Sequence, residues 1–504
     1  MQGRTKSSEG AARVPSARVV LAAGLVALIA TTVNALGAWI PSLWGDEAAT
    51  QLSATRPLPS LMAMLGNIDI VHAVNYITMH FWILMAGSSP FALRFPSAVA
   101  IGLCAGVVVW IGARLRSLPF GVLAGVLTAA LPRLTHAAVE ARAYAFDALF
   151  ATVLMAIIVE VLRRRRPSVW WWVAYGAMLA IATVTFLYVG LLALAIGVVL
   201  WWRGVDRRTW AGWALSSVAG LLLASPVAWI ALHQRGQIAF LATAGHTNPH
   251  AILVEMWFVV DAYAWIAWAL MAIAVVGWVR SCPRRGSPID PVSIALPWAV
   301  LPLALVLASD AVHHDYTPRY LTFAGPAVAL LLASGIAELA RLRVGRVPMA
   351  ALCVTVLVLC VTVPVWSGQR GPWSKRGSDW NDVAALVSAQ SQTGDAIVFD
   401  ESVDPSWRPR LALDTDPAAF AQLRDVQLVT PYAQSPTWHA QTRSTAEALA
   451  AGALEGVSRV WVVEAVVDGV VGTDETSDLR AAGYEIVEHQ RINVSDVSLW
   501  VRVG

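Results

Sequence analysis

Long apolar runs, separated by short arginine-rich or polar stretches, make up the first 366 residues of the chain. Runs of this kind predict membrane-spanning helices, because roughly 20 apolar residues cross the hydrocarbon core. Arginine clusters beside short loops stay in the cytoplasm, which sets the threading. The sequence then predicts eleven spans, with the N-terminus inside and the C-terminus outside. They cover about residues 19–40, 97–113, 119–132, 143–161, 169–186, 188–202, 210–231, 253–279, 291–309, 320–340 and 347–366.

The first positively charged cluster is the N-terminal tail, residues 1–18, which we expect to be cytoplasmic. The apolar run after it has about 22 residues, longer than the roughly 7–15 of a signal-peptide core, so it predicts an uncleaved anchor. The clusters placed inside are Arg4, Lys6, Arg13 and Arg18; Arg114 and Arg116; Arg163 to Arg166; Arg203, Arg207 and Arg208; Arg280, Arg284 and Arg285; and Arg341, Arg343 and Arg346.

One apolar stretch, Asn75 to Gly87, fits no span, because counting it would place Arg163 to Arg166 outside. Its length of about 13 residues is too short to cross comfortably. We expect an interfacial helix, which lies with Met62 to Leu65 in one large external loop, residues 41–95.

The external loops of this topology collect the titratable residues, so any active face is predicted to lie outside. These loops are 41–95 (Asp46, Glu47, Arg56, Asp69, His72, His80, Arg94), 132–142 (Arg133, His136, Glu140, Arg142), 232–252 (His233, Arg235, His246, His250) and 310–319 (Asp310, His313, His314, Asp315, Arg319).

The pattern changes after residue 366, where a polar linker (367–378) leads into an extracytoplasmic α/β domain (379–504). Alternating helix and strand predict a mainly parallel sheet, and the last two strands, joined by Asn493-Val494-Ser495, predict an antiparallel hairpin at its edge. Expected helices are 379–391, 416–424, 442–453 and 474–482, and expected strands are 396–400, 426–430, 458–465, 484–490 and 496–503. No glycine-rich phosphate loop follows any of these strands, and the domain shows no catalytic constellation.

Composition supports a polytopic membrane protein, since only 14% of residues are charged and 57% are hydrophobic. Soluble domains usually carry roughly 25% charged residues. The net charge of +3 gives no reason to expect a nucleic-acid partner. The four cysteines have no metal-ligand spacing and do not decide the redox compartment.

Two adjacent carboxylates, Asp46 and Glu47, come directly after the first span and Trp44. An acidic pair in an external loop is often just solvated. Here the pair lies against the bilayer, where partial desolvation can raise a carboxylate pKa towards that of a useful base. Two further groups of polar residues share this side, Asp69 to Tyr76 with His72, and Glu140 to Asp147 with Arg142 and Tyr144.

Several short motifs together resemble the GT-C superfamily, membrane glycosyltransferases that use polyprenyl-phosphate sugars. The resemblance covers about residues 19–366, and within the superfamily the chain is similar to bacterial relatives of protein O-mannosyltransferases and aminoarabinose transferases, especially actinobacterial cell-envelope mannosyltransferases. The motifs are Trp44-Gly45-Asp46-Glu47, Asp69-x-x-His72-x-x-x-Tyr76, Phe91-Ala92-Leu93-Arg94-Phe95-Pro96-Ser97, Glu140-Ala141-Arg142-Ala143-Tyr144 and Pro318-Arg319-Tyr320-Leu321.

The resemblance implies a first external loop with two juxtamembrane helices and a catalytic aspartate, here Asp46, as the general base. It implies that Glu47, Asp69, His72, Tyr76, Glu140 and Tyr144 position donor or acceptor, and that Arg319, Arg142, His313, His314 and Tyr320 bind the lipid phosphate. Plainer explanations stay open: Arg319 as an interfacial arginine, Arg142 paired with Glu140 or Asp147, His72 and Glu47 as solvated groups, and His313 and His314 as a polar gate.

Some members of this superfamily bind a divalent metal through acids of the external loops, and Asp46, Glu140 and Asp147 are candidates. Because the lipid-phosphate-sugar branch generally works without one, we expect no cofactor. Most tryptophans belong to the interfacial belts, although Trp44, Trp257, Trp373 and Trp380 are placed to stack on sugars.

The sequence therefore predicts an inverting glycosyltransferase in the bacterial cytoplasmic membrane, whose active site and C-terminal domain lie outside. The expected donor is a polyprenyl-monophosphate sugar, most simply mannose, and the acceptor is a glycolipid, polysaccharide or protein. Arabinofuranose is the alternative sugar. A lipid or sugar transporter or flippase would require midplane polar residues and an internal repeat, and a membrane scaffold would leave the clustered polar residues without a reason.

Overall fold

The computed structural model describes residues 16–164, 166–242, 245–314, 316–342, 347–472 and 474–503. The predictions for Arg4, Lys6, Arg13, Arg165, Asp315, Arg343 and Arg346 lie outside these ranges. The chain forms two compact units. Unit 1 comprises residues 1–35, 97–138 and 143–366, and unit 2 comprises residues 36–96, 139–142 and 367–504.

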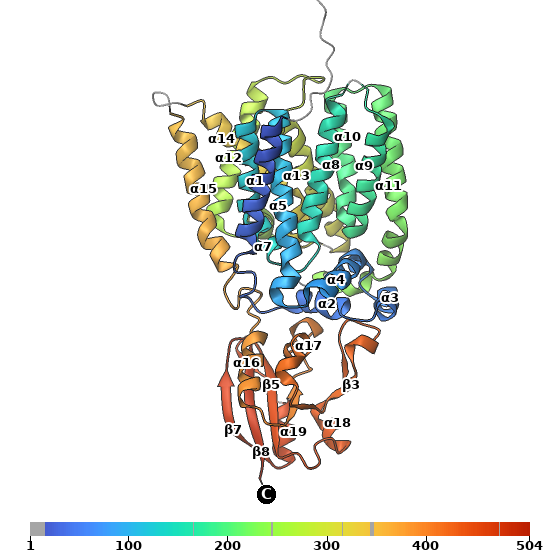
Figure 1. Cartoon of the computed structure of the whole chain (residues 1–504), viewed down its shortest axis with the longest axis vertical. Helices are drawn as coiled ribbons and strands as arrows, with labels where there is room; N and C mark the ends of the chain where they lie inside the picture. The colour runs from blue at the N-terminus through green and yellow to red at the C-terminus, as the bar shows by residue number, and fades with distance from the viewer. Residues whose placement is uncertain are drawn as a thin grey trace, which may run out of the picture. The chain divides into compact units, whose positions relative to one another are not determined.

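Unit 1 is a bundle of apolar helices (Figure 1). Within it, α8, α9, α10 and α11 run alongside one another. Its elements are α1 (Ala17–Ala35), α5 (Pro90–Leu115), α6 (Leu118–Ala130), α7 (Pro132–Ala138), α8 (Tyr144–Leu162), α9 (Val169–Thr185), η2 (Leu187–Leu191), α10 (Leu192–Arg203), α11 (Arg207–His233), η3 (Arg235–Ala242), η4 (Ala251–Glu255), α12 (Asp261–Arg280), α13 (Pro291–His313), η5 (Pro318–Ala324), α14 (Gly325–Leu339) and α15 (Met349–Gly368).

The described residues contain eight helical segments long and apolar enough to cross a membrane, or nine if α6 and α7, bent by 62°, form one span. The polytopic helical fold class is thereby confirmed. Two further predicted spans correspond to α9 and to η2 with α10, each an apolar stretch of 17 residues, shorter than the others. The count of eleven and the orientation remain predictions.

Several predicted span boundaries were wrong, for local reasons. Helix α5 begins at Pro90 rather than 97, because Arg94 is held inside the structure and so does not mark a helix end. Helix α12 begins only at Asp261, since residues 251–255 form a π-helical turn and Val259 adopts a left-handed backbone conformation (φ 66°) that ends it. Pro132 starts a new helix and produces the bend after α6.

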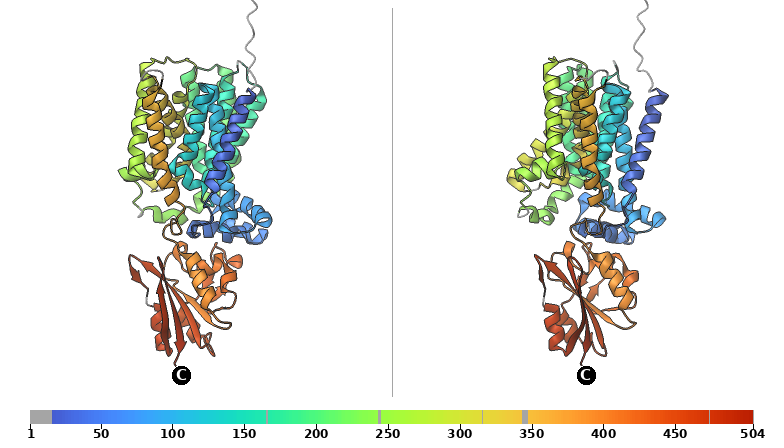
Figure 2. Two further views of the ribbon diagram at one scale, coloured as in Figure 1. Left: turned by 60° about the vertical axis from the view of Figure 1, so that its left-hand side comes forward. Right: turned by 90° about the vertical axis from the view of Figure 1, so that its left-hand side faces the viewer.

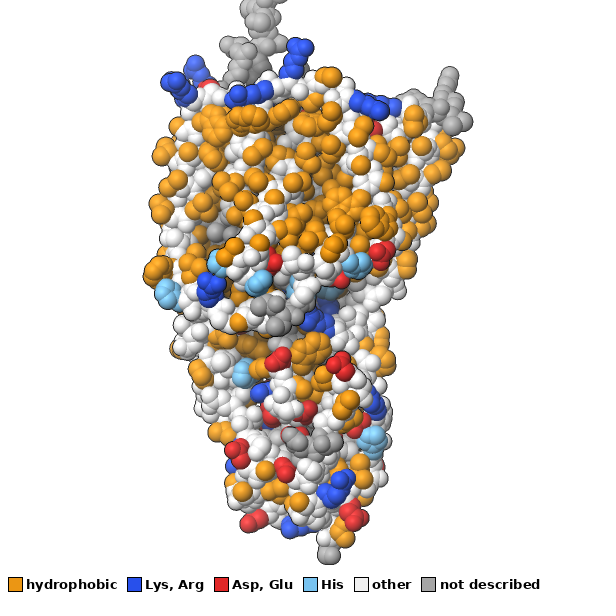
Figure 3. Space-filling model, turned by 180° about the vertical axis from the view of Figure 1, so that it is seen from behind, with side chains coloured by type: hydrophobic (Ala, Val, Ile, Leu, Met, Phe, Trp, Pro, Cys, Tyr) orange, Lys and Arg blue, Asp and Glu red, His pale blue; other side chains and the backbone are white. Residues whose placement is uncertain are grey.

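The arginine clusters that were assigned to one side do meet there. Arg163 donates to the Arg114 carbonyl at 2.7 Å, and Arg203 donates to the Gly286 carbonyl at 2.8 Å. Arg285 donates to the Trp201 carbonyl at 3.2 Å. Figure 3 shows Lys and Arg side chains gathered at one end of the apolar surface, as a positive-inside face requires.

Unit 2 joins the first loop, residue stretch 139–142 and the C-terminal region. The loop, for which one interfacial helix was predicted from the residues, contains three α-helices: α2 (Gly45–Ala54), α3 (Leu58–Asn67) and, after η1 (Ile70–His72), α4 (Ala73–Ala86). Helix α4 matches the predicted stretch and exposes Phe81, Leu84 and Met85. Such an apolar face suits an interfacial helix, which remains a prediction.

The C-terminal region of unit 2 is an α/β domain with helices on both faces of its main sheet (Figure 2). Strand order is β2-β1-β5-β8-β7. Its elements are α16 (Trp380–Gln390), β1 (Ala396–Phe399), η6 (Pro405–Trp407), α17 (Leu411–Thr415), η7 (Pro417–Phe420), β2 (Arg424–Asp425), β3 (Leu428–Thr430), η8 (Tyr432–Gln434), β4 (Gln441–Thr442), α18 (Thr445–Ala450), β5 (Arg459–Val467), β6 (Val470–Val471), α19 (Asp474–Ala481), β7 (Tyr484–Arg491) and β8 (Ser495–Arg502).

The α/β class and the terminal hairpin are confirmed, but the sheet is mixed rather than mainly parallel. Strand β1 runs parallel to β2 and β5, whereas β8 runs antiparallel to both β5 and β7. The hairpin turn is fixed by Asp379, whose carboxylate accepts the backbone N–H groups of Asn493, Val494 and Ser495 at 2.9 Å each. The helix predicted at 416–424 was wrong, because only the short η7 forms there, and the strand predicted at 426–430 is reduced to Leu428–Thr430.

The two faces of this sheet pack into different cores. Val398 and Val462 face the core that contains Leu479 of α19, whereas Ile397 and Trp461 face a second core beside α16. The second core continues into buried residues of α2, α3 and α4. The first loop and the C-terminal domain therefore share one hydrophobic core, which the sequence did not predict.

Candidate active site

Helix α2 carries the acidic pair in its first turn, where the positive end of the helix dipole favours carboxylates. Trp44 precedes the helix in an extended conformation. Asp46 is partly exposed, whereas Glu47 and the seven residues that follow it are buried. The two adjacent acids therefore have different surroundings, and of the two only Asp46 is partly exposed.

Glu47 belongs to a buried ion pair with Arg94. Two parallel hydrogen bonds of 2.8 and 2.6 Å join the Arg94 guanidinium to the two Glu47 oxygens, and both side chains are 0% exposed. Glu47 also accepts the backbone N–H of Ala141 at 2.9 Å. Arg94 donates further to the carbonyls of Ala38, Pro41 and Ser42. This bidentate pair fixes the turn before α2 and explains Glu47 as a structural residue.

Asp69 and Tyr76 form a second polar pair of the first loop. The Tyr76 hydroxyl donates to Asp69 Oδ2 at 3.0 Å. Asp69 adopts a left-handed conformation (φ 63°, ψ 24°), which is uncommon for a residue other than glycine and costs free energy unless its surroundings hold it. The Tyr76 bond is one such restraint.

Arg142 connects these residues to α2. Its Nη2 donates to His72 Nε2 at 2.8 Å, and its Nη1 donates at 3.3 Å both to the Tyr76 hydroxyl and to the Asp46 carbonyl. Because a guanidinium only donates, Nε2 of His72 must be an acceptor, so this contact requires that ring nitrogen to be unprotonated. The expected pairing of Arg142 with Glu140 or Asp147 stays a prediction.

Electrostatics also link Asp46 and Asp69. Burial raises the pKa of Asp69, the Arg142 guanidinium and the Tyr76 hydrogen bond oppose that rise, and the negative charge of Asp46 adds to it. Burial likewise raises the pKa of Tyr76, so its hydroxyl stays a donor. The structure thus brings together Asp46, Asp69, His72, Tyr76 and Arg142, all predicted site residues of unit 2.

A buried lysine, Lys375, lies near the charges of Glu47 and Glu140 and was missed by sequence reasoning. Lys375 is 2% exposed, and its Nζ makes no hydrogen bond to any described residue. Burial lowers the pKa of Lys375, whereas the charges of Glu47 and Glu140 raise it. Burial also lowers the pKa of the neighbouring Arg370 to about 9. Glu140 is itself buried and acts within this charge cluster rather than at an open surface.

The predicted phosphate-binding residues of unit 1 form an aromatic cluster of their own. The Arg319 guanidinium lies 5.7 Å from the ring centre of Tyr144, a cation–π arrangement. Tyr320 packs against Tyr144, Phe186 and Tyr188 at ring-centre distances of 6.4, 5.3 and 5.7 Å. Arg319, Tyr320 and Tyr144 are therefore brought together, and their role in binding phosphate stays a prediction.

His313 and His314 lie at the exposed C-terminal end of α13. Arg235 Nη2 donates to His313 Nδ1 at 3.3 Å, and His314 adopts a left-handed conformation (φ 52°) that ends the helix. Their predicted role in binding lipid phosphate stays a prediction.

Metal and sugar-stacking candidates were also compared with the structure. No group of three or more His, Cys, Asp or Glu side chains in the described ranges has an arrangement that could hold a metal ion. Trp257 and Trp380 are buried, which removes them as sugar platforms, and Trp44 is 8% exposed. Trp373 is exposed, but its indole N–H donates to Asp382 at 2.7 Å.

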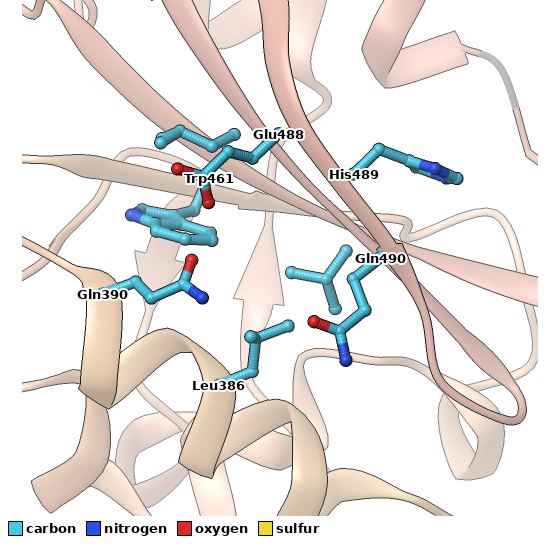
Figure 4. Close-up of a pocket in the computed structure, with 8 residues that line it drawn as sticks. Leu386, Gln390, Trp461, Glu488, His489 and Gln490 are labelled. Carbon is cyan, nitrogen blue, oxygen red and sulfur yellow. The ribbon is translucent and has the colours of Figure 1, made fainter.

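A cavity of about 280 Å³ lies in the C-terminal domain, between α16 and the β7–β8 hairpin (Figure 4). Leu386 and Gln390 face Gln490 there, while His489 points away from the others. None of the predicted site residues lines it. Its lining is Leu386, Gln390, Trp461, Glu488, His489, Gln490, Val497 and Leu499.

No protein-family model and no curated protein sequence matches the chain. Solved structures do match it. ArnT from Cupriavidus metallidurans bound to undecaprenyl phosphate superposes with a TM-score of 0.60 and 14% identity, covering 96% of this chain and 98% of ArnT. The Archaeoglobus fulgidus oligosaccharyltransferase in complex with zinc and sulfate gives 0.50 and 12% identity, covering 88% and 67%.

Arabinofuranosyltransferase AftD from Mycobacteria gives a TM-score of 0.52 and 14% identity over 97% of this chain, which spans 42% of AftD. At these identities the likeness establishes the fold. The chain has the GT-C fold expected from its motifs, and among these three structures only ArnT matches over nearly its whole length as well.

Proposed function

We propose that the protein is an inverting glycosyltransferase that moves a sugar from a polyprenyl-monophosphate carrier to a hydroxyl acceptor. The fold supports this proposal, because the chain aligns along its length with ArnT, whose structure holds undecaprenyl phosphate. The single observation that carries it is the different surroundings of the two adjacent acids. Glu47 forms a buried ion pair with Arg94, whereas Asp46 is partly exposed near Asp69, His72, Tyr76 and Arg142.

In the proposed step the Asp46 carboxylate takes the proton of the acceptor hydroxyl. The acceptor oxygen attacks the anomeric carbon, and the bond from that carbon to the phosphate oxygen breaks with inversion. The products are the glycosylated acceptor, the polyprenyl phosphate and a protonated Asp46, which returns its proton to water. Phosphate is a good leaving group, so a second carboxylate acting as acid is not needed, unlike in glycoside hydrolysis.

Two arginines are the candidates for binding the leaving phosphate. Arg319 lies over the Tyr144 ring, and a guanidinium can give a phosphate two parallel hydrogen bonds. Arg142 is already bound to His72, Tyr76 and the Asp46 carbonyl, so we assign it mainly the positioning of α2. Asp69, Tyr76 and His72 then orient the base and the acceptor through that network.

We take mannose as the transferred sugar, with arabinofuranose as the alternative, and a cell-envelope glycolipid, polysaccharide or protein as the acceptor. The fold does not choose between the sugars, because the likeness to an arabinofuranosyltransferase is only 14% in identity. We place the reaction at the outer face of the cytoplasmic membrane, since the positive-inside rule puts the arginine clusters at the inner face.

The test is an in vitro transfer assay with polyprenyl-phosphoryl mannose or arabinose and membrane acceptor extracts. Wild type is compared with Asp46→Asn and with Glu485→Gln, a matched control that removes an exposed carboxylate of β7. We expect product with one of the donors, and its loss only in Asp46→Asn. Absence of transfer from either donor by the wild type would overturn the proposal.

A further inference from the structure

A short turn of the C-terminal domain lies directly on the start of α2. A β-carbon built on Gly45 would lie 2.4 Å from the carbonyl oxygen of Ser406, which is in the η6 turn, so only glycine allows this approach. Gly45 precedes Asp46, and Ser406 precedes Trp407. The C-terminal domain thus places Trp407 next to the segment that carries the proposed base.

Trp407 is an exposed aromatic side chain held on one side by a cation. The Arg376 guanidinium lies 5.0 Å from the ring centre of Trp44 and 5.9 Å from that of Trp407. Trp44 is largely covered, but Trp407 keeps 44% of its surface exposed. Arg376 is exposed as well, so an aromatic surface and a hydrogen-bond donor group are offered together.

The loop that presents Trp407 is braced from both sides. The backbone N–H of Trp407 donates to the Asp404 carbonyl at 2.8 Å, and Arg408 forms an ion pair with Glu401 at 3.0 Å. The buried Arg410 joins Glu401 to Asp425. A ligand that packs on a side chain fixed in advance loses less free energy to ordering than one that must order a loop.

An exposed indole beside a guanidinium matches the surface of a sugar ring. One face of a sugar ring presents C–H groups, which pack on an aromatic face, and its edge presents hydroxyls, which need both donors and acceptors. Arg376 supplies donors, and the exposed Ser402 and Asp404 of the same loop supply acceptors. A peptide has fewer hydroxyl groups than a sugar, so it would form fewer hydrogen bonds with these donors and acceptors.

We propose that Trp407 and Arg376 form a subsite for a saccharide ring next to Asp46. It rests on the proposed function in one respect, since the ring would be the sugar of the acceptor or of the donor. Its binding chemistry does not depend on turnover, so it can be tested separately. On this account the C-terminal domain takes part in substrate binding as well as in packing.

The test uses fluorine NMR of the full-length protein labelled with fluorotryptophan, in detergent micelles. Trp407→Phe and Trp373→Phe identify the two signals by their loss. Trp373 is the matched control, because it is also 44% exposed and lies in the same unit. Mannotriose and arabinotriose serve as acceptor-type probes at millimolar concentration, and polyprenyl-phosphoryl mannose serves as the donor-type probe.

We expect a saturable shift of the Trp407 signal and no shift of the Trp373 signal. A shift with the free oligosaccharides assigns the ring to the acceptor, and a shift with the donor alone assigns it to the donor. In the transfer assay, Trp407→Ala should raise the KM of that substrate on the order of tenfold, with little loss for Trp407→Phe.

Two outcomes would overturn the subsite: no shift of the Trp407 signal with any of the three probes, or equal shifts of both signals. A protein that shows the Trp407 shift but transfers no sugar would instead contradict the proposed function and leave the subsite standing. The two failures are therefore distinguishable.

Discussion

Two carboxylates that are adjacent in the sequence have separate roles in the structure. Glu47 sits fully buried against Arg94, and Asp46 stays partly open beside Asp69 and Arg142. The separation follows from helix geometry, since consecutive residues of a helix point in directions roughly 100° apart. One neighbour faces the core of unit 2 and the other faces away from it.

Removing the Glu47 charge should destabilise the protein strongly. In Glu47→Gln the Arg94 guanidinium stays buried but loses its negatively charged partner. Such a loss typically lowers the free energy of unfolding by about 3–5 kcal/mol. We expect a clearly lower thermal unfolding temperature of the purified protein. Arg94→Leu should be worse, because it also leaves the Ala38, Pro41 and Ser42 carbonyls without their donor. Unfolding temperatures equal to that of Glu485→Gln would show that the pair contributes little.

At the residue scale, the sequence predicted which residues lie in the site but not the contacts among them. Asp46, Asp69, His72, Tyr76 and Arg142 were chosen from motifs, and they do lie together. Lys375 and Trp407 carried no such signal, because a single lysine or tryptophan in a polar stretch is ordinary, and only the fold shows one buried and the other exposed beside α2.

Helix α2 is stabilised mainly by elements distant in the sequence. Gln51 donates to the Thr415 carbonyl at 2.9 Å, and Arg56, just after the helix, donates to the carbonyls of Ser435 and Thr437. His80 of α4 contacts the Ala54 carbonyl at 2.8 Å. A helix of ten residues is marginal by itself, so its position depends on these contacts.

The long, strongly patterned elements were the predictable ones. Apolar helices and strands such as β5 and β8 have a clear period, whereas η6, η7 and the turns of residues 256–260 are set by local backbone conformation. The mixed direction of the sheet was missed because β8, one strand of the terminal hairpin, pairs antiparallel with β5. Alternation of helix and strand along the chain does not reveal this pairing.

The junction of β1, β5, β8 and α19 should respond to pH through Glu464. Burial, and then the negative charges of Glu475, Asp496 and Asp400, raise the pKa of Glu464 to about 8. A carboxyl whose pKa is raised on folding stabilises the fold fully below its unfolded pKa of about 4.3, and that contribution is lost as the pH rises through about 8.

We therefore expect Glu464→Gln to flatten the loss of stability between these pH values and to be more stable than wild type above pH 8. Thermal unfolding of the full chain across this range measures it, with Glu485→Gln as the exposed control. Parallel curves for wild type and Glu464→Gln would refute the assignment.

At the scale of the whole molecule, both units are assembled from stretches far apart in the sequence. Unit 2 combines the first loop, four residues around Ala141 and the whole C-terminal region. The predicted division, with a transmembrane domain over 19–366, a linker over 367–378 and a separate domain over 379–504, stays a prediction. Contacts between distant stretches leave no periodic signal, so composition alone could not show that the first loop packs with the C-terminal domain.

Orientation is the prediction that belongs to the whole chain. The predicted topology, with eleven spans and the arginine clusters inside, puts the C-terminus outside. A reporter enzyme that is active only outside the cytoplasm, fused after Gly504, should therefore be active, and the same reporter inserted at the 163–168 loop should be inactive. The reverse pattern would refute the topology and the outward site.

The central claim is that Asp46 is the general base of a sugar transfer, and turnover of Asp46→Asn tests it most directly. A positioned base contributes roughly 10²–10⁴-fold to rate, so the account predicts a loss of kcat on that order in a variant that unfolds at the wild-type temperature and keeps its donor binding. Wild-type turnover by folded Asp46→Asn would contradict it.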